Sequence, residues 1–279
     1  MAIIHTLKNW DKLLILATLT TVIVLFGLKN ARAVENVSLP SHQQGLWADI
    51  VQDHRNYYSW RNLWSLGIAF GVGGAMAYSD IDEDVREWYQ DDVRSSSTDD
   101  FAEIVKNFGE GEIMIPLTLL AAGAGYFIPE ESRASPIGEW GLKTTRSYLV
   151  GVPSMLLMQR VTGASRPDES SSGSEWNFSK DNNGVSGHAF MGAVPFMTVA
   201  GMNDNLMVKI LSYGASMLCA WSRINDDDHY VSQAALGWFM ALQASDSVFQ
   251  TDRDREKSYS FLIVPMGADG VGIMLAFSR

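Results

Sequence analysis

Uncharged stretches recur along the chain, separated by short polar or acidic segments. No charged residue occurs within residues 62–79 or 113–129, and three later apolar stretches cover residues 188–202, 205–222 and 232–245. Stretches of this length and composition predict helices, and a helix that is apolar on most sides has to be covered by other elements. The pattern therefore predicts a tightly packed helical core.

The connecting segments predict helices of a different kind. Residues 80–93 are acidic and amphipathic, which indicates a helix that faces solvent, and residues 99–112 predict a second helix. Residues 138–160 predict a long helix with a kink at Pro153, because proline cannot donate the backbone hydrogen bond. The Ser-rich residues 168–184 predict a weakly ordered loop.

The C-terminal tail follows another pattern. Residues 258–279 are rich in β-branched and aromatic residues, which predicts a short hairpin of two strands. We expect an all-α fold, a helical bundle with this C-terminal β-hairpin, divided into residues 1–33, 34–257 and 258–279. A compact globule lying against a membrane is favoured, and a protein that spans a membrane six times is the alternative.

Composition and charge exclude several classes of function. The formal charge is -11, and a surface for nucleic acid needs clustered Lys and Arg, so no nucleic-acid partner is expected. Cys219 is the single cysteine, which excludes an internal disulfide and a thiolate metal cluster. Its apolar neighbours in the sequence predict a buried structural thiol.

The N-terminal segment predicts export. Lys8 and Lys12 precede the apolar run 13–28, and Ala31 and Ala33 follow at the spacing of a cleavage site. This is the pattern of a secretory signal, and an uncleaved anchor is the alternative. Either reading places the remainder in the periplasm or cell envelope, anchored in or lying on the inner membrane.

Two short segments carry residues that suit an anion. Arg166 precedes Pro167, which disfavours helical geometry, so this Arg is expected just past a helix end, where its guanidinium can grip two oxygens of a phosphate. Ser186 is a natural N-cap for the apolar helix that follows. Gly187 lets backbone amides approach an anion closely, and His188 then lies in the first helical turn.

A third segment, Trp221–Gln233, combines an Arg, a His and three consecutive Asp. Arg223 precedes His229 by six positions, and Gln233 follows His229 by four, which places both on one face if the segment is helical. The aspartates 226–228 are expected to form a solvated loop, with an effect on a neighbouring His only if they lie close to it.

The three segments together resemble the type 2 phosphatidic acid phosphatases and their relatives, the bacterial acid phosphatases and vanadium haloperoxidases. The resemblance covers residues 113–248, and the matching residues are Gln159, Arg166–Pro167, Ser186–Gly187–His188, Ser222–Arg223, His229 and Gln233. It implies the helical-bundle fold of that superfamily. It also implies a phosphatase acting on a phosphorylated small molecule or a lipid phosphate, with a membrane surface as a further partner.

The resemblance further implies a role for each residue. His229 would attack phosphorus to form a phosphohistidine, and His188 would protonate the leaving oxygen and then activate water. The phosphate oxygens would be held by Arg166, Arg223, Ser186, Gly187 and Gln159. No metal or other cofactor is implied, apart from vanadate if the chain is a haloperoxidase.

Two positions depart from the family's pattern. Gln159 stands where the family has a Lys, which removes one positive charge; Arg160 and Lys180 are the other sources of charge nearby. Gln233 stands where the family has an Asp, and its carbonyl can orient His229 but cannot offset the charge on an imidazolium.

These departures leave four readings. The first is a metal-independent phosphatase working through a phosphohistidine. The others are a non-catalytic module that binds phosphate or a lipid headgroup, a vanadate-dependent haloperoxidase, and a purely structural protein.

Overall fold

The computed structural model describes residues 42–127, 135–169, 173–258, 261–266 and 270–275. The predicted signal or anchor, residues 1–33, lies outside the described residues. The helices are α2 (His42–Tyr57), α3 (Trp60–Ala77), α4 (Ile81–Trp88), η1 (Tyr89–Val93), α5 (Ser96–Val105), η2 (Lys106–Gly109), α6 (Gly111–Phe127), α7 (Ser135–Thr162), α8 (Gly187–Gly201), α9 (Leu206–Ser216), α10 (Leu218–Asn225) and α11 (Val231–Ser258). The strands are β1 (Phe261–Met266) and β2 (Gly270–Leu275). The predicted all-α bundle is therefore confirmed.

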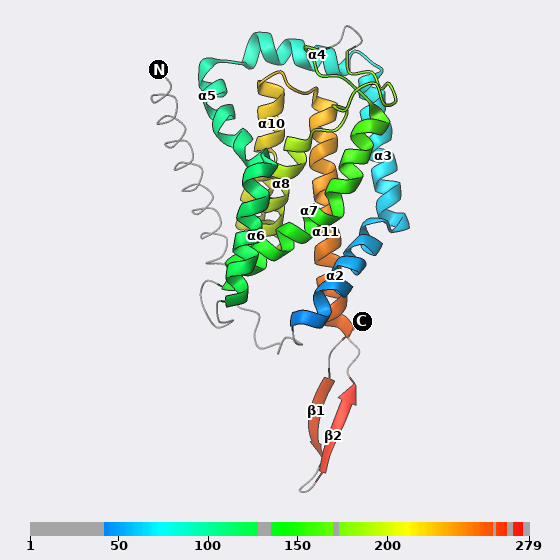
Figure 1. The fold of residues 1–279 in the computed structure, drawn as a ribbon, viewed down its shortest axis with the longest axis vertical. Coiled ribbons are helices and arrows are strands. Elements are labelled where there is room, and N and C mark those ends of the chain that lie inside the picture. The colour runs from blue at the N-terminus through cyan, green and yellow to red at the C-terminus, as the bar shows by residue number, and fades with distance from the viewer. Residues whose placement is uncertain (1–41, 128–134, 170–172, 259–260, 267–269, 276–279) are drawn as a thin grey trace.

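Helix α8 lies at the centre of the bundle. Every residue from Ala189 to Ala200 is buried, as the uncharged sequence predicted. The helix packs against α7, α9, α10 and α11, and α11 runs the full height of the bundle beside it (Figure 1). Ser186 caps α8, accepting a hydrogen bond from the Ala189 backbone. The opening residues of α8 are thus held in place by the core.

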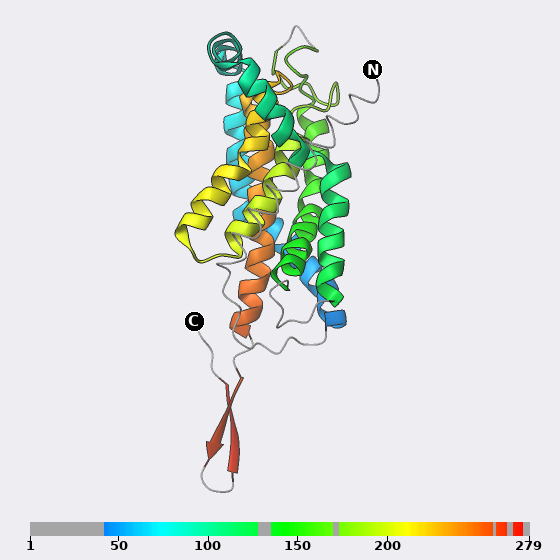
Figure 2. The same ribbon diagram turned by 90° about the vertical axis from the view of Figure 1, so that its left-hand side faces the viewer.

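Some helix limits differ from the sequence-based prediction. The predicted helix 205–222 is divided at Met217 into α9 and α10, and Figure 2 shows α9 at the outer side of the bundle. Helix α11 continues past residue 245 to Ser258. Charged residues on its last turns would disfavour burial, but Asp252 pairs with Arg146 of α7 and so joins that end of α11 to the bundle.

The acidic helix α4 does not simply face solvent, which corrects the sequence-based prediction for residues 80–93. Asp82 is fully buried, and its carboxylate accepts hydrogen bonds from the backbone N–H and hydroxyl of Ser232, at 3.0 and 2.6 Å. These bonds satisfy donors at the N-terminus of α11 that the helix itself leaves unpaired. The Asp82 carboxylate therefore joins α4 to the N-terminus of α11 through hydrogen bonds.

Large apolar side chains are exposed along the sides of the bundle. They lie on α3, α6, α7 and α9, and the most exposed include Trp60, Ile68, Leu120, Phe127, Leu157, Leu206 and Met207. Apolar surface this extensive is unusual for a monomer in water. No helix among the described residues is both long enough and apolar enough to cross a membrane.

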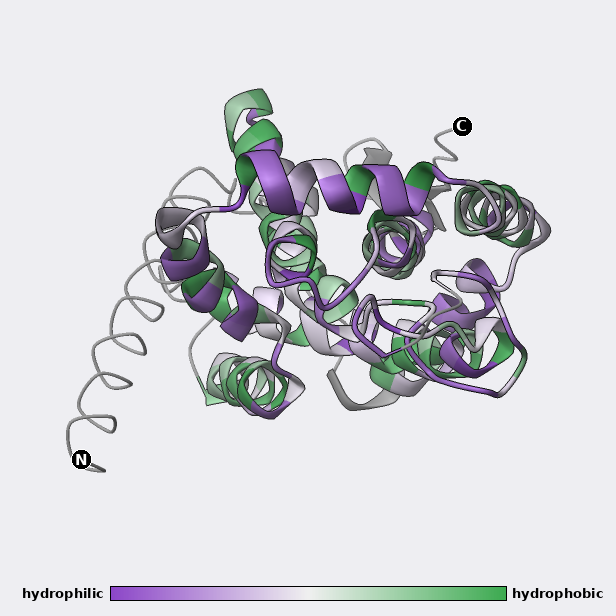
Figure 3. Cartoon of the chain, turned by 90° about the horizontal axis from the view of Figure 1, so that it is seen from above, coloured by the Kyte–Doolittle hydropathy of each residue, from purple (hydrophilic) through white to green (hydrophobic). Residues whose placement is uncertain are grey.

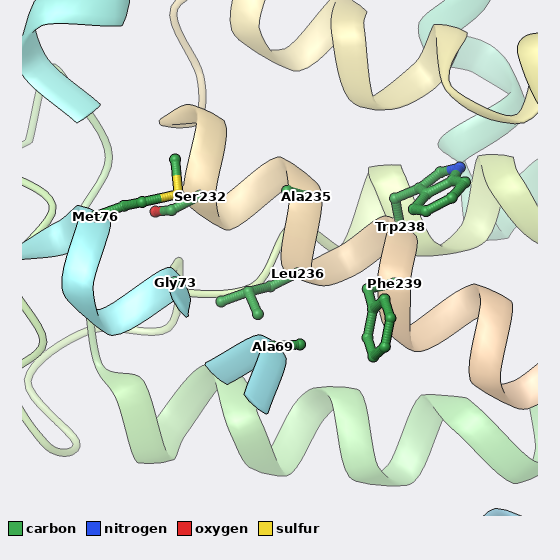
Figure 4. Close-up of a pocket in the computed structure, with 8 residues that line it drawn as sticks. All are labelled: Ala69, Gly73, Met76, Ser232, Ala235, Leu236, Trp238 and Phe239. Atoms are coloured by element: carbon green, nitrogen blue, oxygen red, sulfur yellow. The ribbon is translucent and has the colours of Figure 1, made fainter. Parts of the chain in front are cut away.

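A shallow groove interrupts this lateral surface between α3 and α11. It has a volume of about 210 Å³, and Figure 4 shows Met76, Leu236 and Phe239 among its lining side chains. The two helices approach closely beside it, because a Cβ on Gly73 would lie 2.8 Å from the Leu236 side chain.

The C-terminal hairpin is confirmed. Strands β1 and β2 pair antiparallel, with Phe261 opposite Leu275 and Met266 opposite Gly270. Figure 1 shows the hairpin beyond the end of α11, away from α4.

Candidate functional site

The three predicted segments meet at the α4 end of the bundle. The Ser186 backbone N–H donates to the Gln233 carbonyl at 2.9 Å, which joins the start of α8 to the start of α11. Gly237 permits this approach, since a Cβ there would lie 2.2 Å from the Ser186 carbonyl oxygen. Seen from above in Figure 3, hydrophilic segments lie over this end of the bundle.

His229 is hydrogen-bonded to Gln233, although the two residues do not share a helix as the four-residue spacing suggested. The His229 Nδ1 atom lies 2.9 Å from Gln233 Oε1, which also accepts the Tyr230 backbone N–H at 3.3 Å. His229 itself lies before α11 begins at Val231, so the contact crosses the helix N-terminus rather than one helical turn. The amide of Gln233 thus holds the imidazole at the start of α11.

The orientation of the Gln233 amide follows from its second contact. Its Nε2 lies 2.9 Å from the carbonyl oxygen of Ser165, and a carbonyl can only accept a hydrogen bond. The NH₂ end therefore faces Ser165, and the oxygen end faces His229. Since Gln233 Oε1 can only accept as well, His229 carries its hydrogen on Nδ1 and leaves Nε2 with a free lone pair.

Burial keeps His229 neutral. The residue is 5% exposed, and desolvation lowers its pKa from 6.5 to about 4. The hydrogen bond to Gln233 opposes this shift, while the charges of Arg166 and Arg223 add to it. At neutral pH the site therefore contains an uncharged imidazole whose Nε2 can act as a nucleophile.

Two arginines flank this imidazole from different segments. Arg166 lies past the end of α7, as its neighbour Pro167 predicted, and Arg223 lies in the last turn of α10. Both reach the same carboxylate, because Arg166 Nη1 lies 3.5 Å from Asp228 Oδ1 and Arg223 Nη1 pairs with Asp228 Oδ2. Arg223 also pairs with Asp226 through Nη2.

The acidic run is therefore not a solvated loop, and that prediction is wrong. Asp226 and Asp228 are counter-ions of Arg223, while Asp227 forms two hydrogen bonds of 2.7 Å with Arg86 of α4. Asp227 has a positive φ of 58°, a conformation that Asp tolerates better than most residues. Each carboxylate of the run is therefore paired with an arginine, either Arg223 or Arg86.

His188 lies in the first turn of α8 and contacts an acidic residue that the sequence did not single out. Its Nε2 lies 3.2 Å from Glu110 Oε1, at the start of α6. A carboxylate can only accept, so this contact favours the hydrogen on Nε2. Glu110 is 78 positions away in sequence, and no spacing rule could have paired it with His188.

Gln159 lies beside the turn that opens α8. Its Nε2 donates to the Val185 carbonyl at 2.8 Å and would lie 3.4 Å from a Cβ on Gly187. The Gln159 side chain thus lies beside the start of α8, but its amide donates to a backbone carbonyl, and it adds no charge to the site. Arg160 and Lys180, the other predicted sources of charge, are exposed.

Cys219 is buried, as predicted, and burial raises its pKa to about 12. Its thiol donates to the His188 carbonyl at 3.2 Å, so it supports the backbone of α8.

Comparisons with known proteins found a similarity to a solved structure. No protein-family model matches the sequence, and no curated protein matches it significantly. Among solved structures, the chain is similar to the crystal structure of the first transmembrane PAP2 type phosphatidylglycerolphosphate phosphatase from Bacillus subtilis. The TM-score is 0.49 and the identity 18%, over 71% of this chain and 98% of that one.

Proposed function

We propose that this protein is a metal-independent phosphatase of the type 2 phosphatidic acid phosphatase kind, which cleaves a phosphomonoester through a phosphohistidine. The observation that carries the proposal is the buried, neutral His229, oriented by Gln233 and flanked by Arg166 and Arg223. A nucleophile in the correct tautomer beside two guanidinium groups is what phosphoryl transfer requires.

In the first step, His229 Nε2 attacks phosphorus, and the bond from phosphorus to the leaving oxygen breaks. His188 lies on the neighbouring helix start and donates the proton that the leaving oxygen needs. Water then attacks the phosphohistidine, loses a proton to His188, and releases inorganic phosphate. Both histidines return to their starting protonation states.

The charge on phosphate is held by two arginines and by the start of α8. Arg166 and Arg223 can donate hydrogen bonds to phosphate oxygens, and the N-terminus of α8 presents backbone N–H groups of Gly187 and His188. When His229 becomes phosphorylated, its imidazole acquires positive charge. Gln233 can accept the Nδ1 hydrogen throughout but cannot offset that charge, so turnover slower than with an Asp is expected.

We also propose that the protein works at a membrane of the cell envelope and accepts a lipid phosphate. The support is the exposed apolar surface on α3, α6, α7 and α9, which lies along the sides of the bundle while the polar site lies at one end. A lipid bilayer would cover such a surface, and aromatic residues such as Trp60 and Trp64 suit its interface.

The test uses purified protein in EDTA with p-nitrophenyl phosphate and with phosphatidic acid in mixed micelles. Wild-type protein should release phosphate, and His229→Ala should abolish this release. A phosphohistidine is labile in acid and stable in base, and a label with this behaviour should appear on no residue other than His229. Extraction tests the location: release by osmotic shock contradicts membrane association, and a requirement for detergent supports it.

A second function has its own support. Asp226 and Asp228 pair with Arg223, and Gln159 adds no charge to the site. A module that binds a headgroup without turnover is therefore the alternative. Equal trace release by wild type and His229→Ala would favour it over the phosphatase. Bromide oxidation that appears only with added vanadate would instead identify a haloperoxidase.

A further inference from the structure

We propose that Asp228 is an internal competitor for the phosphate site, and that it sets the affinity and selectivity of the site for anions. The proposal rests on the function above, because it assigns Arg166 and Arg223 to phosphate. The Asp228 carboxylate bridges Arg166 and Arg223, with one oxygen paired with each arginine.

A carboxylate bridging two guanidinium groups resembles a bound oxyanion in charge and hydrogen bonding. A phosphate that used the same donors would have to displace Asp228 from both. Asp226 holds the second side of Arg223, so Arg223 keeps a counter-ion even when Asp228 leaves. An arriving phosphate therefore exchanges one anionic partner for another, rather than pairing with bare arginines, and its net gain in binding energy is reduced.

The displacement needs only a side-chain rotation. The Asp228 backbone is fixed, because its N–H donates to the Arg223 carbonyl at 3.0 Å and the neighbouring Asp227 is held by Arg86. The side chains that must move are the exposed ones: Asp228 is 34% exposed and Arg166 is 37% exposed, while Arg223 is 6% exposed. The buried Arg223 is the fixed half of the clamp, and Asp228 and Arg166 are the mobile half.

Selectivity follows from the same exchange. A monoanion that offers two oxygens reproduces no more than Asp228 already provides, whereas a phosphate dianion offers a third oxygen and a second charge. The site is thus expected to reject carboxylates and to admit phosphate dianions.

The experiment measures binding of inorganic phosphate by calorimetry in the His229→Ala background, where turnover cannot interfere. Asp228→Asn keeps the shape and removes the charge, and it should tighten phosphate binding at least tenfold. It should also allow acetate to compete, which it does not in the parent. Asp227→Asn is the matched control: it removes the same charge from the same loop, but from the Arg86 pair, and should change affinity less than threefold.

Equal tightening by Asp228→Asn and Asp227→Asn would show that only overall charge matters and would overturn the proposal. Weaker binding in Asp228→Asn would overturn it too, because Asp228 would then be a support for the arginines. Asp228→Ser, which also lacks the carboxylate, replaces Asp228→Asn if the latter unfolds, as judged by circular dichroism.

Failure of this proposal is separable from failure of the phosphatase proposal. Turnover by the wild-type protein with no gain in phosphate affinity in Asp228→Asn would overturn the competitor role alone. A gain in affinity in a protein without turnover would overturn the phosphatase function and leave the role of Asp228 intact.

Discussion

The Nδ1 atom of His229 lies 2.9 Å from Oε1 of Gln233, and the amide that holds it is itself held by the Ser165 carbonyl. The Gln233 amide orients the imidazole of His229, whereas a carboxylate at this position would orient it and also supply negative charge. Orientation and charge compensation can therefore be separated by substitution at Gln233, because either property can be changed while the other is kept.

Replacement of Gln233 by Leu removes its hydrogen bonds to His229, Tyr230 and Ser165, and leaves three buried polar groups without these partners. We expect phosphate release to fall by about two orders of magnitude or more, and stability to fall by about 1–3 kcal/mol. Gln233→Asp should instead raise kcat, because a carboxylate offsets the charge on the phosphorylated imidazole. Steady-state rates and urea unfolding measure the two effects. A rate in Gln233→Leu equal to that of wild type would contradict the orienting role.

Acid should destabilise the protein through His229. The pKa of His229 is 6.5 in the unfolded chain and about 4 in the folded protein, so above pH 6.5 both states are neutral and the stability is complete. As the pH falls from 6.5 to 4, the unfolded state binds a proton that the folded state does not. This linkage removes on the order of 3 kcal/mol, and below pH 4 the loss is complete.

The measurement compares urea unfolding of wild type and His229→Gln at pH 7.5 and pH 4. Other groups titrate in both proteins, so the difference between their pH dependences isolates His229. A loss of stability as large in His229→Gln as in wild type would assign the effect to other residues.

The contact from Asp82 to Ser232 should be worth a measurable part of the stability. Asp82→Ala removes the acceptor for two donors at the start of α11, which we expect to cost about 2 kcal/mol. Because His229 lies two residues before this helix, phosphate release should fall as well. Asp84→Ala is the matched control, since Asp84 is an exposed carboxylate of the same helix, and it should change stability by less than about 0.5 kcal/mol. Urea unfolding and rate measurements on both variants check the expectation.

Restoring charge at Gln159 should tighten the binding of inorganic phosphate. A Lys there would lie beside Gly187, where the Gln159 amide now donates to the Val185 carbonyl. We expect Gln159→Lys to strengthen binding by about tenfold, the scale of one charge-assisted hydrogen bond. Gln159→Met, similar in length but neutral, should not strengthen it. Calorimetric titration distinguishes the two, and equal affinity in both variants would place residue 159 outside the phosphate site.

Local sequence was sufficient wherever one short segment dictates its own geometry. Pro167 predicted that Arg166 lies past a helix end, and Ser186 predicted the cap of α8. The uncharged run after His188 predicted the buried central helix, because an apolar surface on all sides leaves burial as the stable arrangement. The hairpin after α11 was equally readable from its residue types.

Only the tertiary structure decided which charges meet. The acidic residues looked alike in sequence, yet Asp82 caps α11, Glu110 contacts His188, and Asp228 bridges two arginines. The partners of Asp82 and Glu110 lie 150 and 78 positions away, and a charge pattern along the chain contains no information about such distances. The role of each carboxylate, as a helix cap, a histidine partner or a competitor of phosphate, depends on which residues the fold brings into contact with it. The sequence by itself therefore determined the helical bundle and its buried central helix, and the packing of distant segments decided which charges lie around the candidate site.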